Sequence, residues 1–143
     1  TLDNLVRIAD TANLDAVQLH GDEDEAFIQS LKERTNVEIW KAVQIRSAAD
    51  VEKWIDSSAD ILLFDAYHKD ERGGTGEVFD WSSLDAFERP FMLAGGIDST
   101  NVARAIRTVR SYGIDISSGI ETNGVKDDEK ITAFTKIVKS IGR

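Results

Sequence analysis

An aspartate at the end of an apolar run is the residue of this sequence best suited to acid–base chemistry. Asp65 directly follows residues 61–64, Ile-Leu-Leu-Phe, which have the character of a buried strand. Such a strand delivers the carboxyl group to the mouth of a pocket, where partial desolvation raises a pKa towards the range useful for donating a proton. Asp65 is therefore our candidate general acid, and an N-cap or loop anchor is the alternative use of this side chain.

Three further polar side chains lie at or near predicted strand ends and are candidates for binding a substrate. Gln18 and His20 close one strand, where His20 either contacts a substrate or forms a structural hydrogen bond. Asp115 lies between two isoleucines of another predicted strand. If the isoleucines face the helices, Asp115 points to the opposite side of the sheet, and its partner there is a sugar hydroxyl or, alternatively, Lys41.

Two short segments rich in glycine and serine have the character of a phosphate site. Gly95-Gly96 follows one predicted strand, and Ser117-Ser118-Gly119 lies at the end of the next. Glycine lets backbone amides approach an anion closely, and serine hydroxyls add hydrogen-bond donors. A tight turn is the alternative for either segment alone. The pair on adjacent strands favours phosphate, which (β/α)8 barrels commonly bind with their last two loops.

A third glycine-rich segment and the acidic residues fit other roles. Residues 73–76, Gly-Gly-Thr-Gly, lack the Lys-Ser/Thr ending of a P-loop and are interpreted as a mobile lid or flexible turn. The acidic run at residues 22–25 suits the N-terminal end of a helix, which favours capping over a metal role. No histidine pair or carboxylate cluster has metal-ligand spacing, so we expect no metal.

The composition is that of one globular domain without a general affinity for polyanions. The 143 residues are 41% hydrophobic and 30% charged, with no cysteine and a formal net charge of −9. This charge argues against nucleic acid or a membrane as a partner, so any phosphate must be held locally. No apolar run approaches the roughly 18 residues of a membrane span, and no targeting signal or disulfide is expected, which favours a cytoplasmic location.

The spacing of apolar residues predicts an α/β fold that positions these candidates. Strands are predicted at residues 15–20, 37–45, 60–65, 91–94 and 114–117, and helices at about 2–9, 23–34, 47–57, 80–87, 102–109 and 127–141. In the third helix, Val51, Trp54 and Ile55 are expected to face inward. The repeat fits a parallel sheet, either doubly wound or part of a (β/α)8 barrel. The length favours the first, whereas polar residues after successive strand ends favour the barrel.

Motifs in order along the chain resemble the phosphoribosylanthranilate isomerase family over essentially its whole length. They are Ala16-Val-Gln-Leu-His-Gly21, Leu62-Leu-Phe-Asp65, Gly73-Gly-Thr-Gly76 followed by Phe79-Asp-Trp81, Leu93-Ala-Gly-Gly96 with Asn101-Val102, and Asp115-Ile-Ser-Ser-Gly119 with Glu121 and Gly124-Val-Lys-Asp127. The resemblance implies a (β/α)8 barrel that catalyses the Amadori rearrangement of N-(5-phosphoribosyl)anthranilate in tryptophan biosynthesis. This is an aldose–ketose type of isomerisation that needs no cofactor and no metal.

The resemblance also implies a role for each candidate residue. Asp65 is the general acid that protonates the ribose ring oxygen, which opens the ring to a Schiff base before a base removes the C2 proton. Asp115 meets substrate hydroxyls, and Gln18 and His20 line the pocket. The backbones that hold the phosphate are those of Gly95, Gly96, Ser117, Ser118 and Gly119.

The sequence departs from the family in containing neither its Lys-hydrophobic-Cys-Gly motif, whose cysteine is the general base, nor an arginine near the second strand that meets the anthranilate. The resemblance equates the five strands with strands four to eight. Residues 1–143 are thus expected to form a single incomplete barrel domain, about five βα units after a leading helix, lacking the first three strands. Without its base the chain alone is expected to be inactive or severely impaired, by about 10²- to 10⁴-fold. An N-terminal barrel segment or self-association is expected to cover the open sheet edges.

Two other functions remain open on the sequence. One is a catalytically silent half-barrel that binds phosphorylated ligands or associates with itself. The other is a different sugar-phosphate barrel enzyme, such as indole glycerol phosphate synthase. That enzyme is disfavoured because its lysine and glutamate constellation is not evident, Lys41 being the only lysine in a predicted strand.

Overall fold

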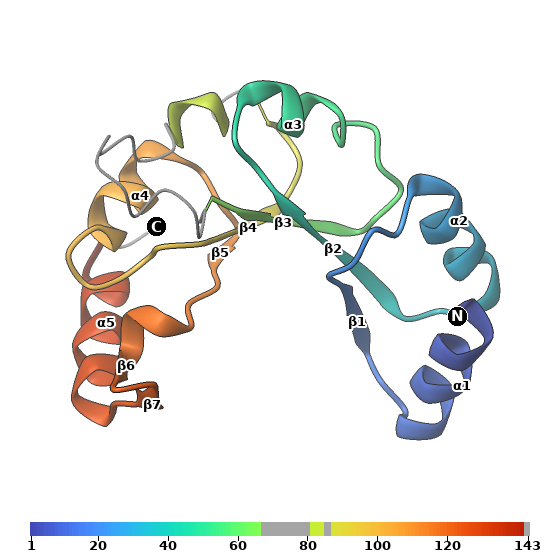
Figure 1. Cartoon of the computed structure of the whole chain (residues 1–143). Coiled ribbons are helices and arrows are strands. Elements are labelled where there is room, and N and C mark those ends of the chain that lie inside the picture. Colours follow the sequence, from blue (N-terminus) through green and yellow to red (C-terminus); the bar gives the residue numbers. More distant parts are fainter. Residues whose placement is uncertain (67–80, 85–86, 142–143) are drawn as a thin grey trace.

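A sheet of five parallel strands forms the centre of the protein (Figure 1). The computed structural model describes residues 1–66, 81–84 and 87–141. Within these ranges the strands are β1 (Ala16–Leu19), β2 (Glu38–Gln44), β3 (Ile61–Asp65), β4 (Phe91–Ala94) and β5 (Gly113–Ile114). The predicted α/β class and the positions of all five predicted strands are confirmed, with one strand shorter than expected.

The order of the strands decides between the two candidate architectures. They are hydrogen-bonded in chain order, β1-β2-β3-β4-β5. A doubly wound sheet reverses direction at a switch point and carries helices on both faces. Here each connection advances by one strand in the same direction, and right-handed crossovers then place all helices on one face. Figure 1 shows the strands as an arc with the helices outside it, which is the barrel-type arrangement.

Five α-helices lie on the convex side of the sheet in the described ranges. They are α1 (Leu2–Ala12), α2 (Glu25–Arg34), α3 (Ala48–Glu52), α4 (Val102–Thr108) and α5 (Asp128–Ile141). Asn13 closes α1 in the left-handed conformation (φ 50°), which asparagine tolerates. The Asp24 carboxylate begins α2 by accepting a hydrogen bond from the Phe27 N–H at 2.9 Å, which confirms capping by the acidic run at this residue. None of these helices is long and apolar enough to cross a membrane.

The third helix is shorter than predicted. After Glu52 the chain continues in tighter turns, in which the Trp54 N–H donates to the Val51 carbonyl at 3.0 Å and the Ile55 N–H to the Glu52 carbonyl at 3.2 Å. These are i to i+3 hydrogen bonds, typical of 3-10 geometry rather than of an α-helix. As a result Ile55 is 46% exposed, and the prediction that it faces inward is wrong.

The last strand of the sheet also ends early, at Ile114. Ser117 has φ −124° and ψ −82°, outside the β region, so the chain cannot continue as a strand. Asp115 therefore follows the strand instead of lying within it, which corrects the prediction. It still belongs to the end of the sheet, because its N–H donates to the Leu93 carbonyl of β4 at 2.8 Å.

A small hairpin that was not predicted connects the sheet to the last helix. It consists of the 3-10 turn η2 (Ser118–Ile120) and the antiparallel strands β6 (Glu121–Thr122) and β7 (Val125–Lys126). Asn123 and Gly124 form its two-residue loop with φ 53° and 79°. Positive φ at both residues defines the turn that Asn-Gly favours, so this dipeptide is the signal that could have predicted the hairpin.

The segment between β3 and β4 is described only in part. A 3-10 turn, η1 (Trp81–Leu84), occupies the described stretch. The predicted lid at residues 73–76 and the predicted helix start at Asp80 lie outside the described residues.

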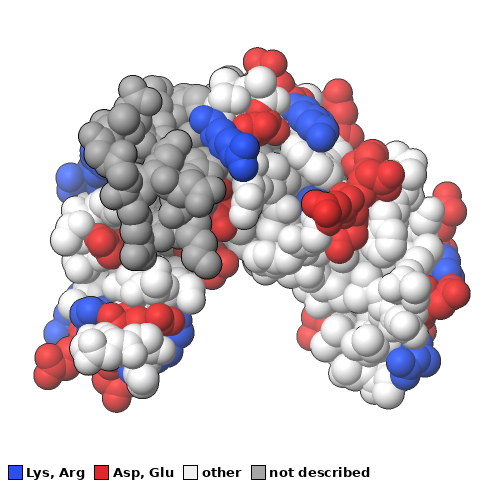
Figure 2. Space-filling view, in the orientation of Figure 1, with Lys and Arg blue, Asp and Glu red and all other residues white. Residues whose placement is uncertain are grey.

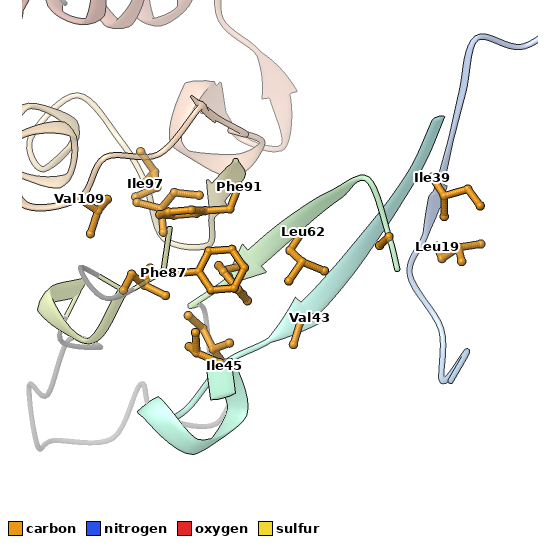
Figure 3. Packing of buried hydrophobic residues seen from close by; sticks show 14 of the residues in the cluster. Leu19, Ile39, Val43, Ile45, Leu62, Phe87, Phe91, Ile97 and Val109 are labelled. Carbon is orange, nitrogen blue, oxygen red and sulfur yellow. The ribbon is translucent and has the colours of Figure 1, made fainter. Parts of the chain in front are cut away.

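The core lies between the sheet and the helices, where alternate strand side chains are buried. The rings of Phe64, Phe87 and Phe91 pack with centroid separations of 5.1, 5.5 and 5.6 Å, two of the three pairs edge to face. Figure 3 shows Leu62 of β3 in the same cluster as Phe87 and Phe91. Because successive strand residues point to opposite faces, this packing sends Asp65 to the concave side of the sheet.

The concave side carries the polar ends of the strands. Gln18 and Gln44 are exposed there, whereas Val17 and Val43 on the opposite face are buried under the helices. Figure 2 shows the molecule hollowed between the two ends of the arc. A substrate site on this side is therefore built from residues at the carboxyl ends of the strands.

Candidate functional site

Most of the predicted site residues meet in one cavity at the carboxyl ends of the strands. The β-ladder pairs Gln44 with Asp65 and Asp65 with Ala94, so Asp65 lies level with the start of the loop after β4. The cavity has a volume of about 240 Å³. It is lined by His20, Asp65, Ala94, Gly95, Gly96, Ile97, Asp115, Ile116, Ser117 and Ser118.

Two of the predicted residues contribute without lining the cavity. The Gln18 amide oxygen lies 2.6 Å from Nε2 of His20. Since an amide oxygen only accepts, Nε2 carries the proton in this hydrogen bond and Gln18 orients the ring. Gly119 instead lies where two loops pack together, as described below. Seven of the nine predicted residues thus line the cavity. Gln18 and Gly119 contact residues of its wall.

The loop after β4 depends on glycine. Gly95 has φ 86° and Gly96 has φ 62°, backbone conformations that residues other than glycine rarely adopt. Asn101 braces this loop, since its amide donates to the Gly96 carbonyl at 2.8 Å and its oxygen accepts from the Asp98 N–H at 3.0 Å. The Gly-Gly pair is therefore held in one conformation by a side chain of the same loop.

Gly119 has no room for a side chain because two loops touch at this point. A Cβ built on it would lie 2.0 Å from the Ile97 carbonyl oxygen and 3.0 Å from Cα of Asp98. A carbon atom cannot approach that closely, so the loop after β5 packs directly on the loop after β4. This contact brings the two segments predicted to bind phosphate to one wall of the cavity.

Lys41 lies on the other face of the sheet and is not the partner of Asp115. Its β-ladder partners are Leu19 and Leu62, whose side chains are buried in the core. The Lys41 ammonium binds Glu23 instead, with Nζ 3.0 Å from the carboxylate. The alternative in which Lys41 forms a salt bridge with Asp115 is therefore wrong. Asp115 lies in the wall of the cavity.

The described residues contain no group of three or more histidine, cysteine, aspartate or glutamate side chains that could hold a metal. On the face drawn in Figure 2, acidic and basic side chains are intermixed over the part of the chain that the structure describes. The electrostatics of the cavity therefore depend on individual local groups.

Both sequence and fold are similar to those of one enzyme family. The profile described as N-(5'phosphoribosyl)anthranilate (PRA) isomerase matches residues 1–137. The chain belongs to this family. The N-(5'-phosphoribosyl)anthranilate isomerase of Endomicrobium trichonymphae is 44% identical over 144 residues, which cover 98% of this chain and 68% of that protein.

Solved structures of phosphoribosylanthranilate isomerases have the same arrangement. The enzyme of Thermotoga maritima matches with a TM-score of 0.81 and 33% identity over 97% of this chain and 68% of that one. A second isomerase structure, in complex with reduced 1-(O-carboxyphenylamino)-1-deoxyribulose 5-phosphate, matches with a TM-score of 0.78 and 31% identity over 97% of this chain. These similarities confirm the resemblance recognised in the sequence.

Three residues of the family motifs have a role near the cavity that the sequence does not reveal. Asn101 braces the glycine loop, and Lys126 and Glu121 form a pair beside Ser117. An asparagine five residues after a Gly-Gly turn is a weak signal, since its use depends on how the loop folds back. Lys126 could have been found only by recognising the Asn-Gly hairpin that turns it towards Ser117.

Proposed function

We propose that this chain supplies the general acid and the phosphate site of a phosphoribosylanthranilate isomerase. The reaction converts N-(5-phosphoribosyl)anthranilate to 1-(o-carboxyphenylamino)-1-deoxyribulose 5-phosphate. The single observation that carries the proposal is the cavity in which Asp65, Asp115 and both glycine-containing loops meet. The ligand in one related structure, reduced 1-(O-carboxyphenylamino)-1-deoxyribulose 5-phosphate, contains a sugar chain and a phosphate, as the product of this reaction does.

In the proposed mechanism Asp65 donates a proton to the ribose ring oxygen. The C1–O bond breaks, the anthranilate nitrogen supplies its electron pair, and a protonated Schiff base forms. A base then removes the proton from C2. The resulting enolamine becomes the ketone when C1 takes up one proton and the C2 hydroxyl releases one, which returns Asp65 to its acid form. Every atom of the substrate is retained, so neither cofactor nor oxidant is needed. Asp65 suits the first step because β3 holds its backbone while its side chain remains at the cavity wall.

The remaining residues bind and orient the substrate. Asp115 accepts hydrogen bonds from sugar hydroxyls, and His20, oriented by Gln18, forms the facing wall. The phosphate is bound by Gly95, Gly96, Ser117 and Ser118, with Gly119 keeping the two loops in contact. The close packing of the two loops at Gly119, which leaves no room for a Cβ, supports this assignment because it couples the loops into one preorganised unit.

The base of the reaction is proposed to come from another segment. This sequence contains no cysteine, the residue that the family uses, and its five strands are proposed to be strands four to eight of the barrel. In the described part of the sheet β1 and β5 are edge strands, to which further parallel strands can be added. On this proposal the chain alone turns over slowly, and addition of the missing strands or self-association restores a closed site.

The proposal is tested by following isomerisation through the fluorescence of the anthranilate group. The chain is assayed alone and mixed with the N-terminal barrel segment of a full-length relative. Turnover in the mixture, reduced about 10²- to 10⁴-fold by Asp65→Asn, is expected. The Asp56→Asn variant, at an exposed position in the turn after α3, is the control. Phosphate binding without turnover in any mixture would instead establish a silent half-barrel, and full turnover by Asp65→Asn would remove Asp65 from the mechanism.

A further inference from the structure

We infer that Lys126 is a positioning residue of the phosphate site, which it organises by holding Ser117 from outside the cavity. This inference rests on the proposed function, because it takes the two glycine-containing loops to be the place where the phosphate binds. Lys126 does not line the cavity itself, whereas Ser117 does.

The contacts of the Lys126 ammonium are all within hydrogen-bond distance. Its Nζ donates to the Ser117 carbonyl at 2.9 Å, to the Ser117 hydroxyl oxygen at 3.2 Å and to the Glu121 carboxylate at 2.7 Å. The three donors of the ammonium are thus used by one serine and one glutamate. The side chain of Lys126 is 50% exposed and that of Glu121 23% exposed.

The hairpin sets this geometry from the sequence. The Asn123-Gly124 turn fixes the register of β6 and β7, which places Glu121 opposite Lys126. Asp127 ties the hairpin to α5, since its carboxylate accepts from the Thr122 hydroxyl at 2.6 Å and from two backbone N–H groups of the first turn of the helix. The hairpin and its hydrogen bonds to the start of α5 therefore place Lys126 beside Ser117.

Two consequences follow for the groups of the cavity wall. First, the Ser117 hydroxyl accepts from an ammonium, so its own proton is left to be donated elsewhere, and a hydroxyl polarised in this way is the stronger donor. Second, C=O and N–H point in opposite directions across a trans peptide. With the Ser117 carbonyl held at Lys126, the Ser118 N–H points away from the lysine, and we assign both donors to the phosphate.

The charge of Lys126 is neutralised by Glu121, which is why we infer positioning of Ser117 instead of direct binding of the phosphate. Glu121 neutralises the ammonium at 2.7 Å, and the Glu121 carbonyl is itself held by Lys130 at 2.6 Å. The pair therefore adds little net charge to the cavity. Its effect on a phosphate passes through the orientation of the Ser117 hydroxyl and the Ser118 amide.

The test compares Lys126→Met, Lys126→Arg and the control Lys130→Met, which removes a neighbouring lysine that contacts Glu121 but not Ser117. Two quantities are measured: binding of inorganic phosphate to the 143-residue chain by calorimetry, and KM and kcat in the complemented assay. Lys126→Met is expected to weaken phosphate binding and raise KM about tenfold, the factor of one charge-assisted hydrogen bond, with kcat changed less than about threefold. Lys126→Arg is expected to restore part of the loss.

Equal effects of Lys126→Met and Lys130→Met, or a fall in kcat without a change in phosphate affinity, would overturn the inference. Thermal unfolding of each variant shows whether the hairpin still folds. A variant that unfolds at the same temperature as the unaltered chain but binds phosphate more weakly has lost the contact and not the fold. If the unaltered chain binds phosphate but never turns over substrate, the proposed isomerase fails while Lys126 is still tested by the binding data. If the unaltered chain binds no phosphate, the phosphate site and this inference fail together.

Discussion

The ammonium of Lys41 lies 3.0 Å from a carboxylate oxygen of Glu23, on the face of the sheet opposite the cavity. The same ammonium donates to the Gly21 carbonyl at 2.5 Å, and the Glu23 carboxylate accepts from the Gly21 N–H at 2.9 Å. The Lys41 side chain is 3% exposed and lies 5.7 Å from the ring centroid of Trp54. A partly buried ion pair thus holds the backbone directly after His20, so core packing and cavity geometry are linked.

Removing this ion pair is expected to destabilise the fold. Lys41→Met keeps the length of the side chain but leaves the Glu23 carboxylate with backbone N–H donors and no cation. We expect the free energy of unfolding, measured in urea, to fall by about 1–3 kcal/mol. Lys32→Met is the matched control, because its pair with Asp60 at 2.6 Å is more than one third exposed and is worth less than about 1 kcal/mol.

A double-mutant cycle checks that the pair itself is responsible. Combining Lys41→Met with Glu23→Gln should cost less than the sum of the single changes, with a coupling of about 0.5–3 kcal/mol. Strict additivity would mean that the Lys41 ammonium stabilises the protein through the Gly21 carbonyl and the Trp54 ring instead.

The choice of partner for Lys41 shows what the sequence could and could not predict. Residues Ile39, Lys41 and Val43 alternate along one strand and share a face, so period two already placed the lysine with the core and away from Asp115. The alternative in which Lys41 pairs with Asp115 is therefore inconsistent with this alternation as well as with the structure. Asp65 was located correctly because four apolar residues precede it on a strand that is buried on both faces.

Other features depend on contacts that no local pattern contains. The approach of Gly119 to Ile97 requires two loops from different strands to pack together, and a glycine after two serines fits a simple turn equally well. The early end of β5 has the same origin, since Ser117 is drawn out of β geometry where η2 begins and Lys126 binds it. Tertiary contacts override strand propensity there.

Filling the space at Gly119 is expected to separate the two loops. In Gly119→Ala the added methyl group overlaps the Ile97 carbonyl, and overpacking of this kind costs about 1–3 kcal/mol. Phosphate binding should weaken as well, because the loops can no longer form one wall. The readouts are the urea unfolding curve and calorimetric titration with inorganic phosphate.

Gly124→Ala is the matched control for the unfolding measurement. Its φ of 79° strains any other residue, but nothing lies within 4 Å of a Cβ built there. The change should therefore cost only the backbone penalty of about 1–2 kcal/mol. If Gly119→Ala lowers the free energy of unfolding less than Gly124→Ala does, the two loops can move apart at little cost and their contact does not organise the cavity.

The brace on the glycine loop can be removed without changing the size of the side chain. Asn101→Asp replaces the amide that donates to the Gly96 carbonyl by a carboxylate oxygen that only accepts. We expect phosphate affinity to fall about tenfold and stability by about 1–3 kcal/mol, since two oxygens would then face each other. Asn4→Asp, on exposed α1, adds the same charge at a distance and should change neither quantity appreciably. Equal phosphate affinities in the two variants would contradict the brace.

Asp60 should make stability depend on pH in the acid range. Burial raises the pKa of this carboxyl group, but the Lys32 ammonium at 2.6 Å and the Ile39 N–H at 2.8 Å outweigh it and hold the pKa below the usual 3.8. A lowered pKa means that the unfolded chain binds the proton more readily. The stabilisation is therefore complete above pH 3.8 and is lost as the pH falls through the folded-state pKa.

Asp60→Asn removes this titration and should flatten the pH dependence of unfolding. Asparagine can still accept from the Ile39 N–H but no longer binds Lys32 as a charge. Because the carboxylate is 36% exposed, solvent screening limits the expected difference to less than about 1 kcal/mol between pH values of roughly 5 and 3. Urea unfolding across this range measures it, with Asp56→Asn as the exposed control. Parallel curves for the unaltered chain and Asp60→Asn would show that other carboxylates with lowered pKa, such as Glu25, carry the acid sensitivity.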